Sequence, residues 1–416
     1  MSPIVTAILV ACNLGLIFLL MTVPLGLRTV RLSRLVAADR HRLWQALWPL
    51  GSDAGWSGEI LSAKAIDDQG TTRIRLSWEG RDGQPIEHKV RLEDVVEDSR
   101  FSMRVLDDTS LDASFWADYR EATELIPEGS ATRIILSRTD RYRGVAFLVF
   151  RCFAMRRELD KLEIWVRTGR YRKGGWFEHP LSQIGFAVLS AFILWPFFGL
   201  NLGGLALAAI LTSVVALHEL GHMAAFRLTG HRKARMIFIP LLGGIAIGGR
   251  PYDSRFEVAF VALMGAGFSA FLVPLLIAAS ALASGEGHGL AAALLATLTG
   301  CAALFNIANL VPVWKFDGGQ VLRQLCPGPV ALAFASFFLL SALLALGWQA
   351  GFSSGFLLAA GAIFAALSLL TMGSAVKPRH ELKPIRTVDR LAMAGALLAV
   401  FAIHGYGVLW ASARLL

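Results

Sequence analysis

Residues 205–226, LALAAILTSVVALHELGHMAAF, form an apolar stretch of membrane-spanning length whose one formal charge is on Glu219. His218 and His222 are four residues apart, so on a helix both imidazoles lie on one face and can bind one zinc ion. Glu219 lies between them, where it can accept a proton from a water on that metal. Ionisable groups at membrane depth are costly and by default mark functional sites. The stretch therefore predicts a metal-dependent hydrolytic site, with Glu219 as its base, inside a membrane.

The composition supports a membrane protein. The chain has 416 residues, 55% of them hydrophobic and 17% charged, which is too apolar for an ordinary soluble protein of this size. The net charge of +9 is explained by basic loops beside membrane spans, where such residues set topology and contact anionic lipid. We therefore expect the lipid bilayer as a partner and no nucleic acid. The four cysteines contain no Cys-x-x-Cys pair, which argues against a disulfide framework or a thiolate metal site.

About eight apolar runs are near the roughly 20 residues that a helix needs to cross a bilayer. They lie at residues 4–27, 181–199, 204–226, 258–283, 290–310, 330–346, 352–372 and 391–410. Basic clusters at 28–34, 172–173, 232–235 and 377–386 all fall on one side if the N-terminus is outside. The segment between the first two runs is then cytosolic, and the two histidines lie nearer the cytosolic face.

These patterns divide the chain into four parts. We predict an N-terminal transmembrane helix over 1–30, a cytosolic domain over 31–172, a membrane core over 173–376, and a cytosolic linker with a C-terminal transmembrane helix over 377–416. The fold class is thus a polytopic α-helical membrane protein joined to a soluble α+β domain.

A third metal ligand is predicted at Asp317, in the segment NLVPVWKFDGG at 309–319. This segment follows the fifth apolar run, which returns to the cytosolic side, so Asp317 reaches the depth of the two histidines. Pro312 ends or kinks the helix, and the glycine pair after Asp317 permits close backbone approach. Two histidines and one carboxylate are a typical ligand set for a catalytic zinc ion, which keeps one open position.

Together the two motifs resemble those of the site-2 protease family of intramembrane zinc metalloproteases. That family pairs His-Glu-x-x-His with a distal Asn-x-x-Pro-x-Pro-x-x-Asp-Gly, which is matched here by Asn309, Pro312, Asp317 and Gly318. Trp314 replaces the second proline, and Phe268 lies in a stretch, GAGFS at 265–269, that lacks the proline and asparagine of a further family element. The resemblance covers roughly 180–376 and implies an intramembrane endopeptidase with one Zn²⁺ per chain. The departures at Trp314 and Phe268 mean that the family's way of positioning substrate does not carry over directly to this chain.

The segment MIFIPLLGGIAIGG, at 236–249, is apolar but too short to cross and return as helices. Gly243 and Gly244 suit a hairpin turn. The resemblance implies a re-entrant β-hairpin beside the zinc, which is tolerated at membrane depth only against protein or a watery cavity. We hypothesise that its edge binds an unwound substrate segment as an added strand; the alternative is a linker hairpin without substrate contact.

Other polar residues in the apolar part have two interpretations each. Asn306 and Asn309 lie near Asp317 and are candidates to donate hydrogen bonds to substrate backbone or oxyanion, whereas the alternative is hydrogen bonding between helices. His231 lies in a charged loop and is expected to be solvated. His404 is alone in the last apolar run and is expected to be packed and hydrogen-bonded.

The cytosolic segment predicts a soluble domain of ordinary size. Asp39 is expected to cap a helix, and a long amphipathic helix is expected over 145–166. Between them, alternating patterns predict about six antiparallel strands near 58–66, 73–78, 88–93, 101–106, 115–125 and 132–138. This order resembles the START-like (SRPBCC, helix-grip) fold, which implies a cavity for a lipid or other hydrophobic ligand. Six aromatic residues either line that cavity or fill the core: Trp44, Trp48, Trp78, Phe101, Trp116 and Tyr119.

The leading hypothesis is a zinc-dependent intramembrane endopeptidase that cleaves a membrane-protein substrate, either single-span or resembling a signal peptide. By this hypothesis it is a multi-pass protein of the bacterial inner membrane, and its cytosolic domain senses a ligand or gates substrate. One alternative is a non-catalytic, membrane-anchored lipid-binding or regulatory protein with a degenerate protease core. Another is a transporter that uses these groups as a proton or metal pathway, although no inverted repeat is apparent.

Overall fold

The computed structural model describes residues 15, 18–20, 23–171, 179–239, 243–313, 316–371 and 379–415, and side chains in all of these except 365–371. The described chain forms two units, each with its own hydrophobic core. The first comprises residues up to 173 together with 373–381, and the second comprises 174–372 together with 382–416.

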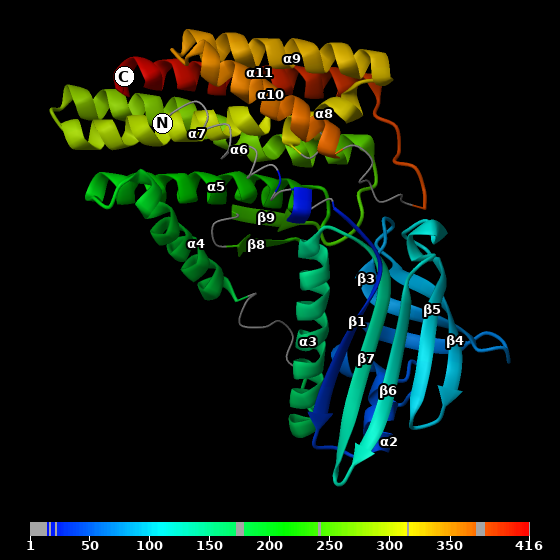
Figure 1. The fold of residues 1–416 in the computed structure, drawn as a ribbon. Coiled ribbons are helices and arrows are strands. Elements are labelled where there is room, and N and C mark those ends of the chain that lie inside the picture. The colour runs from blue at the N-terminus through cyan, green and yellow to red at the C-terminus, as the bar shows by residue number, and fades with distance from the viewer. Residues whose placement is uncertain are drawn as a thin grey trace. The chain divides into compact units, whose positions relative to one another are not determined.

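Seven antiparallel strands form the sheet of the first unit, in the order β1-β7-β6-β5-β4-β3-β2 (Figure 1). Their bounds are Pro24–Val36 (β1), Ile60–Ala65 (β2), Thr71–Glu79 (β3), Pro85–Val96 (β4), Arg100–Asp108 (β5), Arg120–Glu128 (β6) and Ala131–Arg143 (β7). Glycines at positive φ form two of the tight turns, Gly83 between β3 and β4 and Gly129 between β6 and β7. The predicted strand over 115–125 is corrected, because a 3₁₀ turn, Ala113–Trp116, precedes β6.

Helices α2 (Arg40–Leu47) and α3 (Val145–Thr168) also belong to this unit. Asp39 caps α2, and its side chain accepts hydrogen bonds from the backbone of His41 and Arg42, as predicted. Helix α3 buries Met155, Leu159, Leu162 and Val166, a spacing of three and four residues that gives one apolar stripe. That stripe packs in one core with residues of β1 and β7. A long C-terminal helix held against an antiparallel sheet is the predicted helix-grip arrangement.

Strand β1 corrects the predicted start of the domain. The sequence predicts a membrane span over residues 24–27 and a basic loop at Arg28, Arg31 and Arg34, but all of them belong to β1. Val30 and Val36 point into the core, with Leu32 between them. Arg34 is held by α3, where its guanidinium donates to Glu163 over 2.8 Å. The domain therefore begins near residue 24 rather than 31. Most of the rest of the expected first span lies outside the described residues.

The six aromatic residues predicted either to line a cavity or to fill the core form two clusters and leave one residue exposed. Trp44, Trp48 and Phe101 pack on one another, with ring centroids 5.1–5.5 Å apart, and so fill that side of the core. Trp116 and Tyr119 pack together in a second cluster. Trp78 is 54% exposed and lines no interior surface.

The second unit consists of helices and one hairpin. Its helices are α4 (Pro180–Leu194), α5 (Leu202–Leu228), α6 (Arg255–Gly285), α7 (Gly289–Asn309), α8 (Asp317–Leu325), α9 (Pro329–Gln349), α10 (Ser354–Thr371) and α11 (Thr387–Leu415). Strands β8 (Arg235–Ile239) and β9 (Gly243–Ile247) form an antiparallel hairpin. Helix α6 packs against α5, α7, α8 and α11 and is central to this core (Figure 1).

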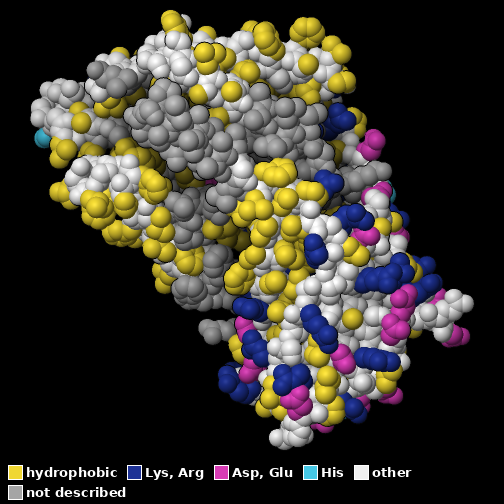
Figure 2. All heavy atoms as spheres, viewed as in Figure 1, with side chains coloured by type: hydrophobic (Ala, Val, Ile, Leu, Met, Phe, Trp, Pro, Cys, Tyr) yellow, Lys and Arg dark blue, Asp and Glu magenta, His cyan; other side chains and the backbone are white. Residues whose placement is uncertain are grey.

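Among the described residues, six helices are long and apolar enough to cross a membrane: Pro180–Phe198, α5, α6, α7, α9 and α11. They correspond to six of the eight predicted spans. The expected span over 352–372 coincides with α10, of which the side chains are described over Ser354–Phe364. Hydrophobic side chains dominate the visible described surface of this unit in Figure 2, whereas acidic and basic side chains are mixed over that of the first unit.

The predicted cytosolic linker also has structure. Arg379 donates to the carboxylate of Asp107 over 2.6 Å, so this residue is part of the first unit. Lys383 belongs to the second unit, where it pairs with Asp253 over 2.8 Å. The boundary between the units in this region therefore lies within the linker rather than at its start.

Candidate metal centre

Helix α5 brings the His-Glu-x-x-His residues together, because its uninterrupted helical spacing places His218 and His222 one turn apart. The side chains of both are largely buried, with 4% and 13% of their surfaces exposed. Each imidazole is oriented by a hydrogen bond through Nδ1. His218 bonds Asn306 Oδ1 on α7 and His222 bonds the Val261 carbonyl on α6, each over 2.8 Å.

These bonds fix which nitrogen is free to bind a metal. A carbonyl oxygen only accepts, so His222 Nδ1 carries the proton that Val261 receives. Asn306 donates its amide to the Ala302 carbonyl, which leaves its oxygen to accept from His218. In neutral imidazoles both Nε2 atoms therefore present lone pairs. Outer hydrogen bonds of this kind are the usual partners of metal-binding histidines.

Asp317 is in the first turn of α8 and completes the cluster. Its Oδ2 atom lies 3.1 Å from His218 Nε2 and 3.4 Å from His222 Nε2, and the two nitrogens are 3.1 Å apart. Tetrahedral zinc with bonds of about 2.0–2.1 Å separates its ligand atoms by roughly 3.3–3.4 Å. The three atoms thus have the spacing of one face of such a tetrahedron.

The donor set also fits a cation chemically. Asp317 is 7% exposed, and its Oδ2 has no hydrogen-bond donor among the described residues. With both imidazoles neutral, two Nε2 lone pairs and one carboxylate oxygen converge on one point, an arrangement that a divalent cation would stabilise. The turn leading into α8 holds Asp317 in place, because the backbone of Leu310 packs directly against Gly318. A Cβ on residue 318 would lie 1.9 Å from the carbonyl oxygen of Leu310.

Gly265 is a further residue of the centre that the sequence did not indicate. A Cβ at this position on α6 would lie 2.5 Å from His222 Nε2 and 2.6 Å from His218 Cε1. The imidazoles therefore rest against bare backbone. Gly265 belongs to the GAGFS stretch, whose comparison with the family element pointed to Phe268 and the missing proline and asparagine rather than to this glycine.

We expect Gly265→Ala to displace both imidazoles and to lower zinc affinity by at least about tenfold, because no Cβ contact below 3.0 Å is tolerated without movement. Gly267→Ala is the matched control on the same helix, where the nearest atom to a new Cβ is Met264 Sδ at 3.4 Å. Zinc titration of the two purified variants measures the difference. Equal zinc affinities would contradict this role for Gly265.

Glu219 faces the hairpin. Its Oε2 accepts a hydrogen bond from the backbone N–H of Ala246 on β9 over 2.9 Å. Gly244 makes room for it, since a Cβ there would lie 2.4 Å from Glu219 Cγ. Gly243 and Gly244 are therefore not the hairpin turn that was predicted; they begin β9, and the connecting residues 240–242 lie outside the described residues.

The two asparagines differ in position. Asn306 is fully buried, and its side chain is occupied by His218 and Ala302, so it positions a histidine rather than a substrate. Asn309 donates to the Phe305 carbonyl of its own helix, which is neither the bond to substrate nor the bond between helices that the sequence predicts for it. Trp314 lies outside the described residues.

Two other histidines are also buried. His231 was expected to be solvated, but it is fully buried and pairs with Glu257 over 2.8 Å, where Arg250 also binds. This correction arises because the chain folds back after α5 and encloses the ring beside the base of the hairpin. His404 is buried as expected and bonds the Ala266 carbonyl over 2.9 Å.

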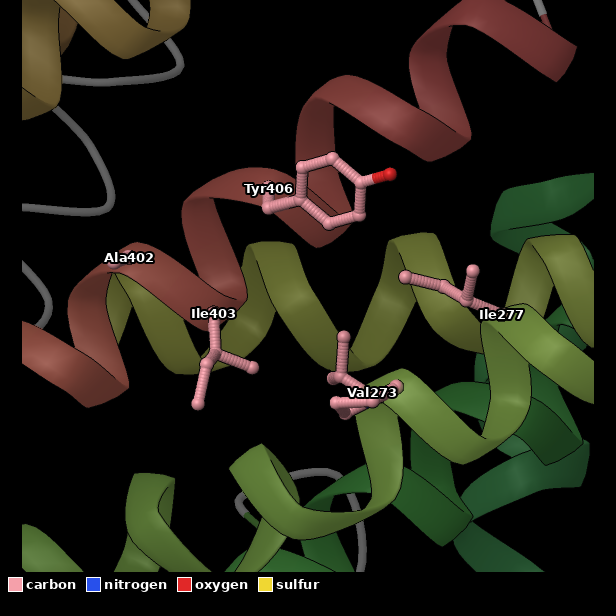
Figure 3. A pocket seen from close by; sticks show the side chains of 6 residues that line it. Val273, Ile277, Ala402, Ile403 and Tyr406 are labelled. Carbon is pink, nitrogen blue, oxygen red and sulfur yellow. The ribbon is translucent and has the colours of Figure 1, made fainter.

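An apolar pocket of about 350 Å³ lies between α6 and α11 (Figure 3). Its lining consists of Val273, Pro274, Ile277, Ala402, Ile403 and Tyr406. None of the cluster residues contributes to it, and apart from the Tyr406 hydroxyl its side chains bring no polar group. It therefore offers space for hydrocarbon rather than a place for hydrolysis.

No family model matches the chain, and no curated protein matches it. Among solved structures, it is similar to a START superfamily protein from Mycobacterium smegmatis, with 15% identity over 33% of this chain and 97% of that one and a TM-score of 0.26. It is also similar to the Aha1 dimer from Colwellia psychrerythraea, with 10% identity over 34% and 98% and a TM-score of 0.27. The protein Mll3558 from Rhizobium loti gives 21% identity over 33% and 96% and a TM-score of 0.25. The helix-grip assignment therefore rests on the strand order and on the packing of α3.

Proposed function

We propose that the chain is an intramembrane zinc metalloendopeptidase of the site-2 protease type, which cleaves a peptide bond of a membrane-protein substrate. The observation that carries the proposal is the convergence of His218, His222 and Asp317, whose ligand atoms lie 3.1–3.4 Å apart. These three residues would hold Zn²⁺, and Glu219 is the next residue on the same helix. An inactive core that had lost its function would have no need to keep this donor set intact.

The surface of the second unit supports a location within a bilayer. Large apolar side chains point outward from its helices; for example, Phe271 on α6 and Phe334 on α9 are 74% and 73% exposed. In water such side chains would be costly, whereas lipid solvates them. In this proposal the basic clusters at 172–173, 232–235 and 377–386 lie on the cytosolic side of a bacterial inner membrane, together with the helix-grip domain.

The proposed reaction follows from the residues in place. A zinc ion would lower the pKa of a water molecule and polarise the scissile carbonyl. Glu219 takes one proton from the attacking water as the oxygen bonds to the carbonyl carbon. It then delivers that proton to the amide nitrogen as the carbon–nitrogen bond breaks, which yields a carboxylic acid and an amine. Asn306 and Val261 hold the two imidazoles in the orientation that this chemistry requires.

The first test is metal analysis of the full-length protein purified in detergent. We expect about one zinc per chain, and we expect added zinc to raise the melting temperature of the metal-free protein, because a ligand that binds only the folded state stabilises it. Cleavage of single-span membrane proteins by the zinc-loaded protein, and its loss with a chelator, would complete the test. A protein that binds no zinc would refute the proposal.

For the cytosolic domain the proposed role is to bind a hydrophobic ligand or to gate substrate, as its helix-grip fold class implies. Because Trp44, Trp48 and Phe101 fill one side of the core, any ligand must occupy another part of the space between sheet and helix. Native mass spectrometry of the purified protein would identify a co-purified lipid. The finding of a ligand-free domain whose melting temperature no lipid changes would contradict this role.

A further inference from the structure

Glu219 of α5 lies at the edge of β9 that does not pair with β8. Along an edge strand of an antiparallel pair, the backbone N–H and C=O groups of alternate residues bond to the neighbouring strand, and those of the residues between them point away from it. The backbone N–H of Ala246 donates to Glu219, so this N–H points away from β8. Ala246 and its register partner Met236 are therefore a non-hydrogen-bonded pair. By the same alternation the backbone N–H of Gly244 also points away from β8, while the backbone groups of Gly243, Ile245 and Ile247 bond to β8.

The other edge of the hairpin has a different neighbour. The outward N–H of Phe238 on β8 is bound by the side-chain oxygen of Gln183 on α4. Among the described residues of the hairpin, it is the β9 edge that brings a backbone donor to the side chain of the proposed base. An extended peptide that paired with β9 would lie next to Glu219 and the metal ligands of α5.

We propose that the N–H of Ala246 is the donor that receives a carbonyl of the bound substrate strand, and that Glu219 occupies this donor when no substrate is present. This inference rests on the proposed function. A substrate carbonyl that takes the Ala246 N–H displaces Glu219 Oε2, and the released carboxylate turns to the attacking water. The base is thus held against the hairpin until a peptide is in position. The glycine at 244 is required because any side chain there would push Glu219 away from β9.

The substrate class follows from this geometry. Outward donors on one strand are two residues apart, or roughly 6.6–6.8 Å, so a pairing segment must be extended over about three residues. A substrate held in an intact helix cannot offer its carbonyls in this way, because they already accept hydrogen bonds within the helix. The site therefore takes an extended polypeptide segment rather than a folded helix.

The test compares two inhibitors that share one metal-binding group. Acetohydroxamate reports on the metal alone, whereas an apolar tripeptide hydroxamate also offers backbone carbonyls to β9. The ratio of their dissociation constants measures the contribution of strand pairing. Both are titrated against the full-length, zinc-loaded protein in detergent, and the zinc content and melting temperature of every variant are measured alongside.

Ala246→Pro removes the outward N–H without removing a hydrogen bond to β8. We expect the preference for the peptide hydroxamate to fall by about fivefold to tenfold, the usual contribution of one hydrogen bond, while Ala246→Ser, which keeps the N–H, retains it. An unchanged preference in a zinc-binding Ala246→Pro protein would overturn the inference.

A second pair of variants tests the occupancy of the donor by Glu219 and does not depend on the proline. Both Glu219→Ala and Glu219→Gln lack the base, but only the alanine leaves the Ala246 N–H free, because glutamine can still accept through Oε1. We expect Glu219→Ala to prefer the peptide hydroxamate several-fold more strongly than Glu219→Gln. An equal preference would overturn the inference, whereas a wild-type protein that binds neither zinc nor acetohydroxamate would overturn the proposed function itself.

Discussion

Glu219→Gln will retain zinc at the wild-type stoichiometry and lose turnover by about 10²–10⁴-fold, the range typical of a removed general acid–base group. Glutamine has the shape of glutamate and still offers an oxygen to the Ala246 N–H, so the hairpin and α5 stay in place. It cannot take a proton from water at neutral pH. Because Glu219 is not part of the triangle of ligand atoms, the metal remains bound. Zinc analysis and cleavage assays on the same preparation measure both halves of this expectation.

The matched control is Glu286→Gln, the same change at a carboxylate that is 70% exposed at the end of α6. It should change neither zinc content nor turnover. In cells, membrane proteomics that compares the wild type with Glu219→Gln should show the natural substrate accumulating uncleaved in the variant. Wild-type turnover by purified Glu219→Gln would mean that another group acts as the base.

Most of the features that the sequence predicts follow from the spacing of residues within a single helix or strand. The spacing of His218 and His222 defines one helix face in any helix, so α5 alone brings them together. The prediction of Asp317 as the third metal ligand has a different basis. Counting the membrane crossings gives the depth of Asp317 in the membrane without any knowledge of helix packing. Helix α3 and the cap at Asp39 follow from short-range patterns in the same way.

What could not be predicted depends on contacts between elements that are distant in sequence. Gly265 matters only because α6 lies against two imidazoles of α5, and no local pattern encodes that contact. Asn306 had been considered for the substrate, yet its partner is a histidine 88 residues away. Strand β1 was missed because its first residues continue an apolar run, and the sheet pairing with β7 outweighs that local signal.

His222→Ala will abolish stoichiometric zinc binding, whereas Asn306→Ala will weaken it by about 10–100-fold, the usual effect of losing an outer hydrogen bond. The first change removes one of three ligand atoms and leaves Asp317 Oδ2 and His218 Nε2 without a third partner. The second leaves every ligand in place but frees the His218 ring to rotate, because the Asn306 bond is what orients it. Both variants should therefore lose zinc affinity, and the loss should be much larger for His222→Ala than for Asn306→Ala.

Competition titrations with a zinc chelator measure this order directly. Thermal denaturation gives an independent reading, because zinc should raise the melting temperature of the wild type, should do so for Asn306→Ala only at higher zinc concentration, and should not do so for His222→Ala. Asn309→Ala is the control on α7, since the Asn309 amide bonds only its own helix at Phe305 among the described contacts. If His222→Ala bound zinc as tightly as the wild type, the cluster on α5 and α8 would not be the metal site, and the hydrolytic mechanism would lose its basis.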